Sequence, residues 1–69
     1  MNNPFEDKAN SEILTLINEY IHSERDRNLL KDRLINGYTF ERLGELHDLS
    51  EVQAKRIVYK QTEKLERVL

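Results

Sequence analysis

A chain of 69 residues that contains no cysteine has few ways to hold a fixed structure. A domain of this size buries only about 60% of the surface that its unfolded chain exposes, so hydrophobic burial leaves little surplus stability. The lack of cysteine also excludes disulfides and zinc sites built on thiolates. What remains is one domain of tightly packed helices, or folding assisted by self-association. Only two glycines and one proline, with 35% charged residues, favour helices over a turn-rich β fold.

Helical periodicity and capping residues predict an all-α, four-helix mini-domain. We interpret residues 1–9 as a flexible lead-in and 10–69 as a single domain, with helices at about 11–22, 24–36, 39–47 and 50–68. The expected N-caps are Asn10 or Ser11, then Ser23, Thr39 and Ser50. Gln53 completes a capping box with Ser50. Gly37 ends the second helix because it tolerates a left-handed conformation.

The first predicted helix carries an unusually apolar stripe, which comprises Ile13, Leu14, Leu16, Ile17, Tyr20 and Ile21. In a chain this small such a stripe is usually core, and the alternative is a surface for a partner or for a homodimer. The last helix has an inward sector made of Ala54, Ile57, Val58, Gln61, Leu65 and Val68. The candidate partner surface consists of apolar residues of the first helix and an acidic pair of the third: Ile13, Leu16, Tyr20, Glu41 and Glu45.

Charge is distributed unevenly along the chain, although the total is only −2. Residues 1–24 carry five acidic side chains against Lys8, a net charge of −4, and residues 25–50 are neutral. Residues 51–69 carry five basic side chains against three acidic ones, a net charge of +2. Since exposed charges are screened beyond about 8 Å at physiological salt, a local basic patch decides what a close partner meets. The negative total therefore does not exclude nucleic acid, and it predicts binding through one face only.

The third and fourth predicted helices are separated only by Asp48, Leu49 and Ser50, and Gly44 lies where the two helices would cross. A short connection and a small residue at the crossing are typical of a helix-turn-helix. Arg and Lys can donate to guanine, Gln can pair with adenine, Val can touch a thymine methyl, and Lys or Tyr can reach phosphate. The expected contacts with double-stranded DNA are Ser50, Glu51, Val52, Gln53, Lys55, Arg56, Tyr59 and Lys60.

The segment from Gly37 to Ile57 resembles the fourth conserved region of bacterial RNA polymerase sigma factors. The likeness rests on a Tyr38-Thr39 start, the small residue Gly44 and a Leu49-Ser50 turn, and it extends over about residues 24–66. The chain also looks like small sigma-like regulators of phages and mobile elements in Gram-positive bacteria. The resemblance implies a helix-turn-helix that reads promoter DNA in the major groove and a surface that docks on RNA polymerase. It places base contacts at Glu51, Val52, Gln53, Lys55 and Arg56.

Two functions follow from these patterns. The first is a sequence-specific DNA-binding regulator of transcription, for which a homodimer would suit paired half-sites. The alternative is a protein-interaction module that docks on RNA polymerase or another transcription factor without reading DNA. The negative total charge, the apolar first helix and the Glu41–Glu45 pair motivate this alternative.

Other classes of function find little support in the sequence. No Ser/His/Asp or Cys/His arrangement and no glycine-rich phosphate loop occur, so we expect no enzyme and no small-molecule substrate. His22 and His47 lie on different predicted helices and are too few for a metal site, and no cofactor is expected. No apolar run approaches the roughly 20 residues of a membrane span, and no signal peptide is evident, so we expect a cytoplasmic protein without membrane contact.

Overall fold

The chain folds into four α-helices. The computed structural model describes residues 5 and 7–69, and it contains α1 (Asn10–Tyr20), α2 (Glu24–Leu34), α3 (Phe40–His47) and α4 (Glu51–Glu66). No strand occurs in the part of the chain that the structure describes. The prediction of an all-α chain with four helices is therefore confirmed.

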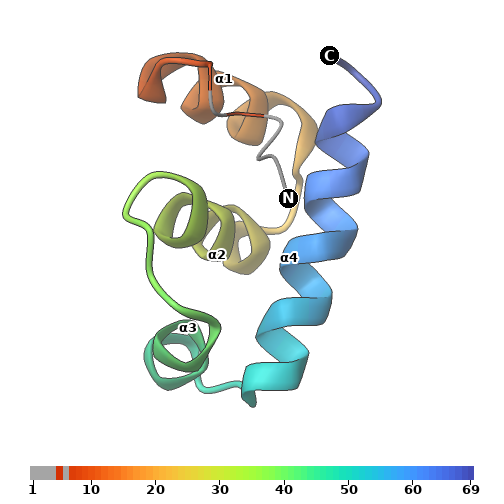
Figure 1. Ribbon diagram of the computed structural model, residues 1–69. Helices are drawn as coiled ribbons and strands as arrows, with labels where there is room; N and C mark the ends of the chain where they lie inside the picture. Colours follow the sequence, from red (N-terminus) through yellow and green to blue (C-terminus); the bar gives the residue numbers. More distant parts are fainter. Residues whose placement is uncertain (1–4, 6) are drawn as a thin grey trace.

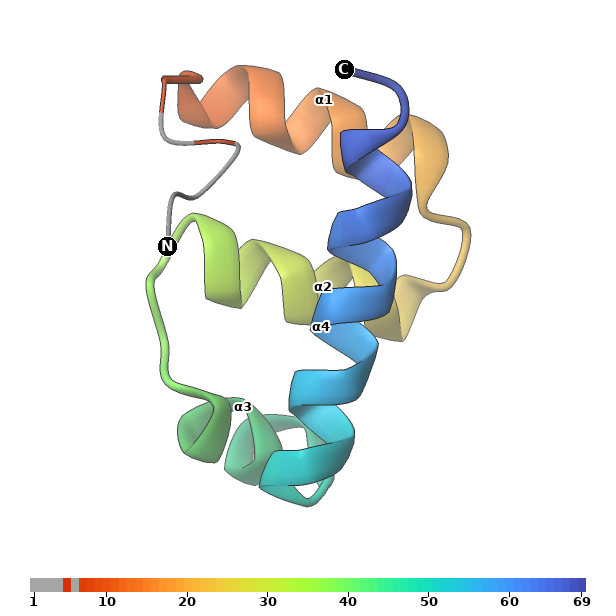
Figure 2. The ribbon, with the colours of Figure 1, turned by 45° about the vertical axis from the view of Figure 1, so that its right-hand side comes forward.

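The longest helix, α4, contacts each of the other three helices. Figures 1 and 2 show α1, α2 and α3 stacked in chain order along α4, with α1 and α3 at its opposite ends. The three stacked helices have 11, 11 and 8 residues. Isolated helices shorter than about 12–15 residues are marginal in water, so these three depend on packing for their stability. Most of that packing is against α4 and between neighbouring helices.

Aliphatic side chains from every helix form a single core beside α4. Burying one such side chain contributes about 1.5–3 kcal/mol relative to leaving it exposed. The buried set is Phe5, Ile13, Ile17, Ile21, Leu29, Leu30, Leu43, Ala54, Val58 and Leu65. The predicted inward sector of α4 is thus confirmed at Ala54, Val58 and Leu65, and Ile57 packs partly buried against the core. Val68 is an exception at 43% exposure, because α4 ends at Glu66.

The N-terminal part of the domain differs from the prediction in three respects. The N-cap of α1 is Ala9, whose side chain makes no capping bond, so neither Asn10 nor Ser11 caps this helix. The helix ends at Tyr20 rather than near residue 22, because Ile21 takes an extended conformation and leads into the connection to α2. Ile13 is only 3% exposed, so it belongs to the core, as expected for most of the apolar stripe, and is not part of the candidate partner surface.

The predicted lead-in, residues 1–9, lies partly outside the described residues, since residues 1–4 and 6 are not described. Phe5 is 2% exposed and belongs to the core cluster. The Lys8 N–H donates to the Phe5 carbonyl at 3.0 Å. Phe5 is therefore part of the core, although it lies within the segment predicted to be a flexible lead-in.

The caps of the later helices follow the prediction. The Ser23 hydroxyl accepts from the Asp26 N–H at 3.3 Å, and the Thr39 hydroxyl accepts from the Arg42 N–H at 3.1 Å. Gly37 has a φ of +72°, the left-handed conformation expected after the end of α2. That helix ends at Leu34, two residues before the predicted end. These local signals set where α2 and α3 begin.

Two polar contacts fasten α3 and α4 to α2. The Asp26 carboxylate is buried, and it accepts one hydrogen bond from the Gln61 amide at 2.7 Å and another from the Arg25 guanidinium at 3.1 Å. Near the other end of α2, the Asp32 carboxylate lies 2.8 Å from Nε2 of His47. Because a buried polar group without a partner is costly, these contacts specify how α3 and α4 sit on α2.

Helices α3 and α4 approach closely at Gly44. A Cβ atom at this position would lie 2.5 Å from the Leu49 carbonyl oxygen and 3.3 Å from the Ser50 carbonyl carbon. The Leu49 N–H donates to the Gly44 carbonyl at 2.9 Å, after Asp48 has reversed the chain with a φ of 56°. Only glycine allows the connection to pass this close to α3.

Gly44→Ala should therefore destabilise the domain by about 1–3 kcal/mol, because the new methyl group meets backbone atoms that cannot rotate away. Urea unfolding followed by circular dichroism measures the loss. Gly37→Ala is the comparison: its Cβ meets nothing within 4 Å, so only the left-handed backbone is strained, by about 1 kcal/mol. Equal or higher stability of Gly44→Ala would contradict the close approach.

Candidate nucleic-acid interface

A reciprocal capping box fixes the first turn of α4. The Ser50 hydroxyl accepts from the Gln53 N–H, and the Gln53 side-chain oxygen accepts from the Ser50 N–H, both at 3.0 Å. The box confirms the predicted N-terminus of this helix. It also occupies the Gln53 oxygen, so a two-point contact of Gln53 with adenine would require breaking the bond to Ser50.

The eight predicted DNA contacts lie together on the exposed side of α4 and at its cap. They are Ser50, Glu51, Val52, Gln53, Lys55, Arg56, Tyr59 and Lys60, and all of them are exposed. Two apolar or aromatic members are unusually open to solvent, since Val52 is 63% and Tyr59 is 56% exposed. Ala54 and Val58 of the same helix are buried on the opposite side. One helix thus supplies both core and a continuous exposed surface.

Four basic side chains of α4 have no acidic partner among the described residues, as is also true of Arg27, Lys31 and Arg33 on α2. Lys8, Arg25, Arg42 and Arg67 are each within 4.0 Å of a carboxylate. By contrast, Lys55, Arg56, Lys60 and Lys64 form no ion pair with any described residue. Their charges are not neutralised within the described domain and remain open to an anionic partner.

A cluster of aromatic rings and cations borders the exposed side of α4. The rings of Phe40 and Tyr59 meet edge to face with centroids 5.7 Å apart. The Lys55 ammonium lies 6.0 Å from the Phe40 centroid and 5.7 Å from that of Tyr59, and the Arg33 guanidinium lies 4.2 Å over Phe40. Each cation–π contact at an exposed site is worth about 0.5–1 kcal/mol, so the two rings restrict where Lys55 can go.

Sequence patterns did not place Arg33 and Phe40 beside Lys55 and Tyr59, because the four side chains come from three different helices. The nearest signal in the sequence is the position of Phe40 directly after the Thr39 cap, which fixes the ring close to the start of α3. Their meeting is a property of the packing of α3 and α2 against α4.

The five residues of the predicted partner surface do not lie together in the structure. Ile13 is buried, Leu16 is partly buried against the core, and Tyr20 is 37% exposed on α1. Glu41 and Glu45 are exposed on α3, where Glu45 lies 3.5 Å from Arg42. Helices α1 and α3 lie at opposite ends of α4 and do not contact each other (Figure 1). The five residues therefore form no continuous surface.

Neither a metal-binding cluster nor a membrane-spanning helix occurs in the part of the chain that the structure describes. No group of three or more His, Asp or Glu side chains there could hold a metal ion. Each helix of this part is too short or too polar to traverse a lipid bilayer. The exposed side of α4 is therefore the feature on which a functional proposal can rest.

Ser50→Ala should lower the free energy of unfolding by about 1 kcal/mol, because it removes the acceptor for the Gln53 N–H and opens the capping box. Chemical denaturation monitored by circular dichroism measures this loss. Ser11→Ala is the matched control: Ser11 is exposed inside α1 and caps nothing, so its replacement should change stability by no more than about 0.5 kcal/mol. Equal effects of the two substitutions would show that the box does not stabilise α4.

Comparisons of this chain with models of protein families, with curated proteins and with solved structures found no match. The likeness of residues 24–66 to sigma factor region 4 therefore stays a prediction from the sequence.

Proposed function

We propose that the chain is a sequence-specific DNA-binding regulator of transcription, in which α3 and α4 act as a helix-turn-helix. In this proposal α4 enters the major groove and α3 braces it from behind. The observation that carries the proposal is the exposed side of α4, where four cations without an acidic partner in the described domain follow a capped N-terminus. Duplex DNA is the partner whose charge and groove shape match such a helix.

The proposal gives each exposed side chain of α4 a role. Arg56 is the candidate for a two-point contact with guanine, because it is exposed and makes no hydrogen bond to a described residue. Val52 suits a thymine methyl, and Lys60 suits a phosphate. Lys55 reaches the DNA from a position restricted by the Phe40 and Tyr59 rings. The N–H groups at the start of α4, next to Ser50, add a further position for a phosphate.

The proposed role is not catalytic, and it places the protein in the cytoplasm with bacterial or phage promoters. The net charge of −2 limits non-specific attraction to DNA, so binding depends on the face of α4 alone. A single helix-turn-helix recognises a short half-site. A homodimer would recognise two such half-sites about one DNA turn apart.

Selection from a random duplex library at two salt concentrations should yield a preferred sequence. On that duplex, Arg56→Ala should weaken binding by about 1–3 kcal/mol and relax the preference at one base pair, as measured by fluorescence anisotropy. Lys31→Ala is the control, since Lys31 lies on α2 and outside the proposed interface. Unchanged binding in both Arg56→Ala and Lys55→Ala would mean that this face does not contact DNA.

A second candidate function is docking on RNA polymerase or another transcription factor without reading DNA. It is favoured by the exposure of two aliphatic side chains near the α3–α4 connection, Leu46 at 48% and Val52 at 63%, together with the acidic Glu41 and Glu45. This function predicts that purified polymerase binds the chain and that Val52→Ser weakens the complex. Duplex binding at low salt should then be absent.

A further inference from the structure

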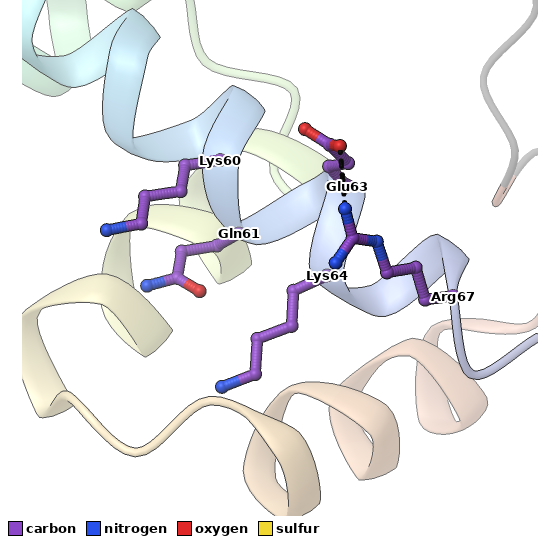
Figure 3. Close-up of a pocket in the computed structure, with 5 residues that line it drawn as sticks. All are labelled: Lys60, Gln61, Glu63, Lys64 and Arg67. Atoms are coloured by element: carbon purple, nitrogen blue, oxygen red, sulfur yellow. Dashed lines mark hydrogen bonds and ion pairs between the residues drawn. The ribbon is translucent and has the colours of Figure 1, made fainter.

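A second cationic feature lies beyond the base-reading part of α4. An open hollow of about 530 Å³ is lined by Lys60, Gln61, Glu63, Lys64 and Arg67. Figure 3 shows Lys60, Gln61 and Lys64 extending to one side of the helix, while Glu63 and Arg67 pair on the other. Of these residues, only Lys60 belongs to the set expected to contact DNA. The others have no role in the contacts proposed above.

The hollow has a fixed wall and an excess of positive charge. The amide of Gln61 is held in place because it donates to the buried Asp26 carboxylate at 2.7 Å. The only carboxylate in the lining, Glu63, lies 3.2 Å from the Arg67 guanidinium. Lys60 and Lys64 form no ion pair with the described residues, so the lining carries two uncompensated positive charges.

Two cations of this hollow lie on the same row of the helix surface as a proposed base-reading residue. Arg56, Lys60 and Lys64 follow one another at intervals of four, so they form one row along the helix surface. Lys64 lies about 12 Å along the helix from Arg56 at a rise of about 1.5 Å per residue. With Arg56 at the base edges, Lys64 lies about two helical turns beyond the base-reading residues, where a cation suits the phosphate backbone that borders the groove.

We propose that Lys64, together with Lys60, forms a second, sequence-independent contact with the phosphodiester backbone of the same duplex. This inference rests on the proposed function, and it adds a backbone site at the C-terminal half of α4. The site would position the helix in the groove without reading sequence, because phosphates carry no base identity. Glu63 limits the site by neutralising Arg67.

The test measures the salt dependence of binding to two probes, the selected duplex and a random duplex of equal length. Lys64→Gln should weaken binding to both roughly three- to tenfold near physiological salt. It should also make the negative slope of log K against log salt less steep by about 0.9. The double variant Lys60→Gln/Lys64→Gln should reduce the steepness of this slope by about twice as much. The ratio of affinities for the two duplexes should stay unchanged. Lys31→Gln is the charge-matched control outside α4 and should leave the slope at the wild-type value.

Glu63→Gln provides a change in the opposite direction, because it removes the negative charge of the lining and releases Arg67. It should tighten binding to both duplexes. The inference is overturned if Lys64→Gln leaves the slope unchanged, if Lys31→Gln reduces its steepness equally, or if the ratio between duplexes changes. In each of these cases, binding of the wild-type chain to the selected duplex would still support the proposed DNA-binding function. If the wild-type chain binds neither duplex, both proposals fail.

Discussion

The packing of α4 against three short helices is the constraint on which the rest of the molecule depends. None of α1, α2 and α3 is long enough to be stable alone, and each reaches α4 with buried aliphatic side chains. Since α1, α2 and α3 all lie along its inner side, Ala54, Val58 and Leu65 are buried and the opposite side stays in water. The exposed row of cations is thus a consequence of how the core is built. A substitution on that row can change binding with little effect on the fold.

The junction between α3 and α4 sets the direction in which the exposed side faces. Because Gly44 has no side chain, the backbone of Leu49 and Ser50 can pack directly against α3. The left-handed conformation of Asp48 reverses the direction of the chain before α4. The capping box at Ser50 then starts α4 at once. All of these features act within about ten residues, so the angle between the helices is fixed locally. The His47–Asp32 contact at 2.8 Å ties the same junction to α2, and the proposed DNA-binding face is held to the whole domain.

In the proposed interface, one cation lies against neighbouring aromatic rings and three have no partner among the described residues. Lys55 is restricted by Phe40 and Tyr59, whereas Arg56, Lys60 and Lys64 have no bonded partner among the described side chains. Because Lys55 is already restricted by the two rings, it loses less conformational entropy on binding than a cation without such contacts. The acidic excess lies in residues 1–24, whereas residues 51–69 carry a net charge of +2, which explains how a chain of net charge −2 can present a cationic face.

The sequence by itself determined the helices, most of their caps, the glycine at the crossing and the exposed set on α4. These depend on interactions within a few residues, namely helical spacing, side-chain capping bonds and the φ angle of Gly37. Tertiary structure alone decided that Phe5 belongs to the core, and that Asp26 is buried with Gln61, 35 residues away. It also brought Arg33 and Phe40 to Lys55 and separated Glu41 and Glu45 from α1. Local patterns could not supply these results, because each depends on where whole helices meet in space.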